Sequence, residues 1–134
     1  MFLSKTDDNV FVYSPTGDVI YEDFDHVNID TYALHSNRVI AVKNVNEVGA
    51  AYFIGQLQQG SIVTDSTWRC VSGAEQSGWY AEDFDDSDWP YAVELGTNVY
   101  DRIASDAKLI WTDDNAGTIY CRKVLQTGSN SISI

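Results

Sequence analysis

Carboxylates and aromatic rings are concentrated in one short stretch of the chain, residues 78–92. Its aspartates include Asp83, Asp85, Asp86 and Asp88. Ca²⁺ takes about six to eight oxygen ligands, so clustered carboxylates of this kind predict a structural Ca²⁺ site. The alternative is that these side chains cap turns while Phe84 and Trp89 are buried. An EF-hand is excluded, because Asp88 stands where that loop requires glycine and Pro90 interrupts it.

Aromatic side chains in the same stretch have the chemistry to bind sugar, since aromatic faces complement the C–H faces of pyranose rings. The predicted ligand-binding residues are Trp79, Tyr80, Tyr91 and, further along the chain, Arg102. Arg69 and Arg122 are further candidate donors to sugar hydroxyls or to a carboxylate, although pairing with nearby acids is the simpler expectation. The alternative for the rings is packing in or beside the core, because Trp and Tyr bury large areas and keep one polar end in water.

Catalytic motifs are missing from the sequence. His26 and His35 are isolated, and no Cys/His spacing is typical of zinc. There is no Gly-x-Ser-x-Gly elbow and no phosphate-binding loop. Paired carboxylates cleave glycosides in many enzymes, but acids this dense on a turn lack the insulated pocket that separates their pKa values. The sequence therefore predicts a protein that is not an enzyme.

The charge of the chain limits its partners. Eight basic residues stand against twenty acidic ones, giving a net charge of −12. Nucleic-acid binding depends on Lys and Arg neutralising phosphates, so it is excluded, and anionic membrane surfaces are disfavoured on the same grounds. No run of about 18 apolar residues predicts a membrane span. Neutral sugars, divalent cations and proteins, including further copies of this chain, remain as partners.

The two cysteines, Cys70 and Cys121, both lie in strand-like surroundings. A disulfide between them is predicted to stabilise the fold by about 4 kcal/mol through loop closure. It would also indicate an oxidising compartment, and hence an extracellular or secreted protein. The alternative is two buried free thiols that pack as small hydrophobic groups. The N-terminus lacks the charged-then-apolar layout of a signal peptide, so the expectation is a protein that is not secreted, or a mature or excised piece.

Short apolar runs separated by turn residues predict a β-rich domain. Strands are expected as a hairpin over 10–21, near Val27 and Ile29, and over 38–45, 50–58, 61–64, 68–71, 108–112 and 118–125. One short helix is expected over 97–104. Trp68, Trp89 and Trp111 are predicted in the core. Residues 1–125 therefore form one predicted β-sandwich domain, and residues 126–134 a flexible or partner-captured tail.

The order of these segments resembles the galactose-binding-domain-like β-sandwich. The specific element is Phe84-Asp85-Asp86-Ser87-Asp88-Trp89, and the similarity at pattern level covers most of residues 7–124. The resemblance implies a jelly-roll fold of the type found as an accessory domain in glycoside hydrolases and in extracellular modules. It also implies a non-catalytic, lectin-like carbohydrate-binding function through loops at one end of the sandwich, often with one structural Ca²⁺.

The N-terminal side departs from this family pattern. The family usually has a further strand before the segment that begins here at Asp8, and the chain starts close to that point. A missing strand leaves a sheet edge open, and exposed edges tend to pair with another strand. The competing hypothesis is therefore a structural or self-assembling module that pairs with protein partners or with its own copies, as a homo-oligomer.

Overall fold

The computed structural model describes residues 2–6, 9–14, 16–23, 30–32, 39–46, 52–57, 62–97, 106–114 and 116–125. These residues form eleven β-strands and no helix, so the all-β class predicted from the sequence is confirmed. Within these ranges, no segment forms a helix long and apolar enough to cross a membrane. The strand pairings recorded among these residues are antiparallel.

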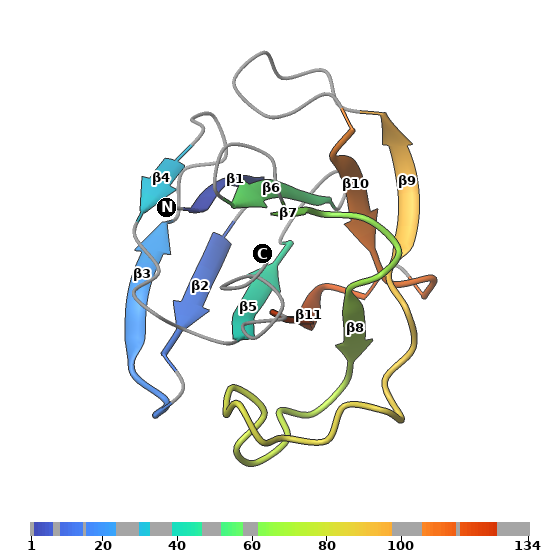
Figure 1. The fold of residues 1–134 in the computed structure, drawn as a ribbon. Coiled ribbons are helices and arrows are strands. Elements are labelled where there is room, and N and C mark those ends of the chain that lie inside the picture. The colour runs from blue at the N-terminus through green and yellow to red at the C-terminus, as the bar shows by residue number, and fades with distance from the viewer. Residues whose placement is uncertain are drawn as a thin grey trace, which may run out of the picture.

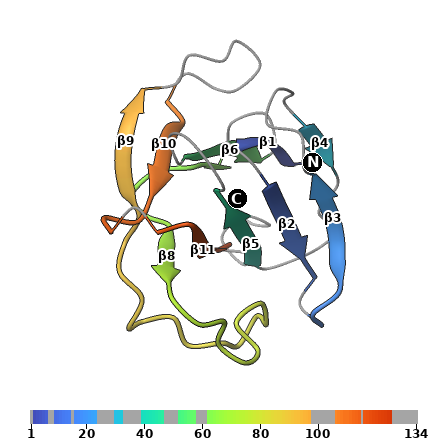
Figure 2. The same ribbon diagram turned by 180° about the vertical axis from the view of Figure 1, so that it is seen from behind.

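The strands are arranged in two sheets (Figure 1; seen from behind in Figure 2). The first sheet has the order β4-β1-β6-β10-β9, with β7 also pairing with β6. Its members are β1 (Phe2–Thr6), β4 (Asp30–Tyr32), β6 (Phe53–Leu57), β7 (Ile62–Val63), β9 (Val93–Thr97) and β10 (Lys108–Trp111). The second sheet has the order β3-β2-β5-β11-β8. Its members are β2 (Asn9–Tyr13), β3 (Val19–Asp23), β5 (Val39–Val45), β8 (Arg69–Ser72) and β11 (Thr118–Val124).

The main hydrophobic core joins the two sheets, as expected for a β-sandwich. Because side chains alternate across a strand, the second sheet contributes every other residue: Val10, Val12, Ile40, Val42, Cys70, Ile119 and Cys121. The first sheet contributes Phe53, Ile110 and Trp111, and Trp68 joins them from the segment before β8. Both indoles are buried, and their N–H groups donate to the carbonyls of Val63 and Ala116. The core positions predicted for Trp68 and Trp111 are confirmed.

The opposite face of the second sheet is covered by the acidic loop, residues 73–92, which links β8 to β9 at the bottom of Figure 1. A separate buried cluster forms there from Ala41 of β5, Tyr120 of β11, and Trp79 and Trp89 of the loop. The two strand residues neighbour inward-facing Val42 and Cys121, so alternation turns them toward the loop. The second sheet is thus packed on both faces.

A disulfide joins Cys70 to Cys121, as predicted. The two residues are directly opposite each other in the β8–β11 pair, with Cα atoms 4.1 Å apart and exposures of 1% and 0%. Among the described strands, β8 pairs with β11 alone and lies at the edge of the second sheet. The covalent bond therefore fixes the strand from which the acidic loop departs. It is also compatible with an extracellular protein, because disulfides persist in oxidising compartments.

Most of the predicted strands are confirmed, with ends that differ by a few residues. The hairpin predicted over 10–21 is the β2–β3 pair. The sequence did not predict β1, β4 or β9. Thr97 ends β9, where the short helix was predicted to begin, and residues 98–104 lie outside the described residues, as do Val27, Ile29 and the tail 126–134.

The expectation that the N-terminal side lacks a strand is wrong. Residues Phe2–Thr6 form β1, which pairs with both β4 and β6. It therefore occupies an interior position in the first sheet and does not leave an edge open. A missing N-terminal strand therefore cannot be the cause of self-association.

A candidate binding pocket between the acidic loop and the end of β11

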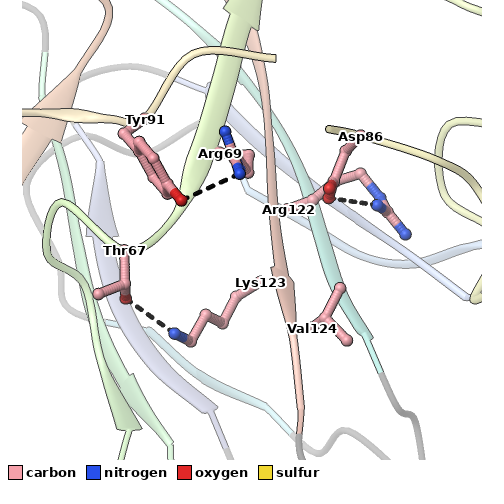
Figure 3. A pocket seen from close by; sticks show the side chains of 7 residues that line it. All are labelled: Thr67, Arg69, Asp86, Tyr91, Arg122, Lys123 and Val124. Carbon is pink, nitrogen blue, oxygen red and sulfur yellow. Dashed lines mark hydrogen bonds and ion pairs between the residues drawn. The ribbon is translucent and has the colours of Figure 1, made fainter. Parts of the chain in front are cut away.

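A pocket of about 220 Å³ lies beside the second sheet (Figure 3). Its lining residues are Thr67, Arg69, Asp86, Tyr91, Arg122, Lys123 and Val124. The pocket exists because β11 is longer than β8: the pairing ends at Arg122 opposite Arg69, while β11 continues to Val124. The space next to this extension is bordered by the acidic loop, which supplies Tyr91 and Asp86.

Two arginines face each other across the β8–β11 pair. Arg69 and Arg122 are directly opposite, next to the disulfide-bonded cysteines, and alternation places both on the face covered by the acidic loop. Like charges in this arrangement repel each other. Each guanidinium therefore needs partners from the loop, and the two arginines obtain them in different ways.

Arg122 is fully buried, and its side chain binds the acidic loop to the second sheet. Its guanidinium donates to the carbonyl oxygens of Phe84, at 3.2 Å, and Ala81, at 2.8 Å. It also forms an ion pair with the Asp86 carboxylate. The guanidinium carbon lies 5.2 Å from the centre of the Phe84 ring. A buried charge is stable only when it is paired and hydrogen-bonded. These contacts pair both terminal nitrogens of Arg122, while its buried Nε has no hydrogen-bond partner in the described part of the chain.

Arg69 interacts with the loop through neutral partners. It donates to the Trp89 carbonyl at 2.8 Å and to the Tyr91 hydroxyl at 3.0 Å. Its guanidinium also stacks on the Tyr91 ring, 3.7 Å from the ring centre. Among the residues that the structure describes, no carboxylate pairs with Arg69. The stack holds an accessible cation in one orientation at the pocket wall.

Lys123 supplies the second accessible cation of the pocket. Its ammonium donates to the Thr67 hydroxyl at 2.8 Å (Figure 3). That hydroxyl in turn donates to the Asp65 carboxylate. In the described part of the chain, Lys123 has no direct ion pair. The pocket therefore contains three cationic side chains and one described carboxylate, and Arg122 is the partner of that carboxylate.

The aromatic residues predicted to bind sugar fall into different environments. Trp79 is 0% exposed and is packed against Tyr13, Trp89 and Tyr120, so it has no face left for a ligand, and its predicted role in stacking is corrected. Trp89, predicted in the core, is confirmed there at 3% exposure. Tyr91 is 58% exposed and lines the pocket.

Tyr80 anchors the acidic loop to the β2–β3 turn. Its ring stacks on Tyr13, with centroids 5.9 Å apart, and lies over Gly17. A side-chain carbon at Gly17 would come within 2.7 Å of that ring, and the glycine has a φ of 96°. Glycine is required here by both the close approach and the left-handed backbone. Tyr80 thus has a structural contact at its ring and does not line the pocket.

The four predicted Ca²⁺ ligands do not gather in one place. Across the described residues, no group of three or more His, Cys, Asp or Glu side chains could hold a metal ion. Asp86 binds Arg122, and Asp85 accepts a hydrogen bond from the backbone N–H of Ser87 at 3.0 Å. Hydrogen bonds from Ser87 lower the pKa of Asp85. Asp83 and Asp88 are exposed. These contacts fit the alternative interpretation, in which the carboxylates shape turns.

Three of the described lining residues are candidates in the sequence: Tyr91 as a predicted ligand-binding residue, and Arg69 and Arg122 as candidate donors. Lys123 and Thr67 were missed, and Arg102 lies outside the described residues. A signal was present in the sequence: a disulfide between directly opposed residues 70 and 121 in antiparallel strands sets 69 opposite 122, so it brings two arginines together.

Tyr120 makes the attachment of the acidic loop sensitive to high pH. Burial, with a smaller contribution from the Glu75 carboxylate, raises the pKa of Tyr120 above its ordinary value of 10.0. A raised pKa in the folded state means that the neutral phenol stabilises the fold fully below pH 10.0. That stabilisation is lost as the pH rises through the higher, folded-state pKa.

We expect the free energy of unfolding to fall above pH 10.0, and to fall less in Tyr120→Phe, which cannot ionise. Urea unfolding on either side of that pH measures the difference. Glu75→Gln provides a second comparison and should reduce the loss in the same direction, because the Glu75 charge opposes ionisation. An equal loss in all three proteins would contradict the assignment.

Comparison of the chain with protein-family models, with curated proteins and with solved structures found no match. The resemblance to galactose-binding-domain-like proteins therefore stays a prediction from the sequence.

Proposed function

We propose that this protein is a non-catalytic, lectin-like carbohydrate-binding module with a jelly-roll fold of the galactose-binding type. The observation that carries the proposal is the exposed Tyr91 ring at the edge of a pocket rich in hydrogen-bond donors. A sugar ring offers an apolar C–H face and several hydroxyl groups. Tyr91 matches the first, and Arg69, Lys123 and Thr67 match the second.

The size of the pocket fits a small ligand. Its volume of about 220 Å³ is below the ~300–1,000 Å³ of pockets that enclose drug-sized molecules. It suits a single ring held at the rim of the sandwich rather than a long chain enclosed by protein. Glycoside hydrolysis generally needs two carboxyl groups, whereas Asp86 is the one carboxylate among the described lining residues and is bound by Arg122. Binding without cleavage is the function that these contacts support.

A glycan array tests the proposal. We expect the wild-type protein to retain at least one glycan, and Tyr91→Ala to weaken that binding by about tenfold, the loss typical of one stacked aromatic contact. Tyr91→Phe keeps the ring and should retain most of the affinity. Binding should be the same with and without Ca²⁺, because the described pocket carboxylate is already paired. No binding across the array would contradict the proposal.

A further inference from the structure

We propose that the pocket recognises the carboxylate of an acidic sugar, such as a uronic acid. This inference rests on the proposed carbohydrate-binding function and names its ligand class. Three of the chain's eight basic residues, Arg69, Arg122 and Lys123, line this one pocket.

Among the described lining residues, the charge balance of the pocket is positive, although that of the whole chain is strongly negative. Twenty acidic residues are available in the sequence, yet Arg69 and Lys123 lack a carboxylate partner within the described residues. Asp86 does not neutralise them, because it pairs with the buried Arg122. Two accessible cations on a chain of net charge −12 are complementary to an anion supplied from outside. The overall charge repels anions in general, so binding here requires direct contact.

The donors of both cations are fixed in position and only partly used. A guanidinium has five N–H donors, and the described contacts of Arg69 engage its two terminal nitrogens through one bond each. An ammonium has three donors, and Lys123 gives one to Thr67. The spare donors of both cations can bond to carboxylate oxygens, and hydrogen bonds to an ionised acceptor are about twice as strong as neutral ones.

The aromatic ring beside these cations explains why a sugar acid fits better than a free carboxylate. The Tyr91 hydroxyl accepts a hydrogen bond from Arg69, which leaves its own proton available to a ligand. The exposed part of the ring can contact the C–H face of the pyranose. A uronic acid carries the carboxylate, the hydroxyls and the C–H face in one small molecule, so it offers a partner to Arg69, Lys123 and Tyr91 together.

The test compares closely matched ligands with and without a carboxylate charge. Glucuronate and galacturonate, their neutral amides and the parent hexoses are titrated into the protein while backbone NMR signals of the pocket are followed. We expect each acid that binds to bind about tenfold more tightly than its amide, as for one charge-assisted hydrogen bond. Arg69→Gln and Lys123→Gln should remove this preference. Lys108→Gln makes the same change in charge on β10, outside the described pocket lining, and should keep the preference for the acid over the amide.

Acetate and the amide titrations separate this inference from the proposed function. Equal binding of acids and amides would overturn the carboxylate inference and leave carbohydrate binding standing. Binding of acetate but of no sugar, lost in Arg69→Gln, would overturn carbohydrate binding while supporting a carboxylate site. Binding of neither sugars nor acetate would overturn both. The wild-type comparison of acid with amide needs no variant, so it decides the question even if a substitution disturbs folding.

Discussion

Removal of the Cys70–Cys121 disulfide is expected to lower the free energy of unfolding by about 4 kcal/mol. The bond closes a loop with a sequence separation of 51, and the cost follows from the entropy that the unfolded chain regains when this loop opens. Typical domains are stable by about 5–15 kcal/mol. The loss is therefore large enough to leave the fold marginal. Urea unfolding of the oxidised and the fully reduced wild-type protein measures it directly.

The double variant Cys70→Ala/Cys121→Ala serves as a control for packing. Both sulfur atoms are in the buried core, so alanine removes apolar contacts in addition to the cross-link. We expect this variant to be somewhat less stable than the reduced wild-type protein. We also expect a steeper dependence on urea in both, because the unfolded chain without the bond exposes more surface. A reduced protein as stable as the oxidised one would show that the β8–β11 pairing alone holds the edge strand.

The strands that sequence reasoning found are those with a clear apolar pattern. Val39–Val45 and Thr118–Val124 are rich in β-branched residues and form the centre of the second sheet. By contrast, Val93–Thr97 mixes a charged residue and a glycine into its run and has mostly exposed side chains. Phe2–Thr6 has two apolar residues followed by three polar ones, so it lacks the alternating apolar pattern of a strand. Such strands are specified by the neighbours with which they pair, which a local pattern does not contain.

The burial of the acidic loop was predictable only in outline. Aromatic residues between carboxylates indicated a folded segment, and the burial of Trp79 and Trp89 confirms this. Whether a tryptophan of this loop is accessible to a ligand depends on the protein surface against which the loop packs. Trp79 is covered because the second sheet presents the small side chain of Ala41 next to Tyr120 on its outer face. That arrangement depends on strand order and register, so the prediction of a stacking role for Trp79 could not be tested from residue types alone.

The pocket could be predicted from residue types even less well than the burial of the acidic loop. Its described lining residues come from three separated parts of the chain: the segment at Thr67 and Arg69, the acidic loop, and the end of β11. The pairing of Asp86 with Arg122 is what leaves Arg69 and Lys123 as the accessible cations. Pairing of arginines with local acids was expected in general. The sequence did not reveal which arginine would pair with Asp86, because that depends on which one the loop buries completely: Arg122 is 0% exposed, whereas Arg69 is partly exposed.

Replacement of Arg122 is expected to be as costly as loss of the disulfide, for a different reason. Arg122→Met keeps most of the apolar stem but removes the donors that hold the carbonyls of Phe84 and Ala81 and the carboxylate of Asp86. Breaking a buried ion pair by removing one partner costs about 3–5 kcal/mol. We therefore expect a loss of that size in urea unfolding. The acidic loop should also separate from the sheet, which a red shift of Trp79 and Trp89 fluorescence would detect.

Arg69→Met is the matched control, because Arg69 is the residue directly opposite Arg122 and undergoes the same chemical change. Arg69 is partly exposed, so water replaces its hydrogen bonds, and the expected cost is about 1 kcal/mol. Asp86→Asn completes a double-mutant cycle with Arg122→Met, and a coupling energy well above that of an exposed ion pair, about 1 kcal/mol or less, is expected. Equal costs for the two arginines would mean that burial beneath the loop does not distinguish them. The contacts of Trp79, Trp89 and Tyr80 would then be enough to hold the loop, and Arg122 would serve the pocket rather than the fold.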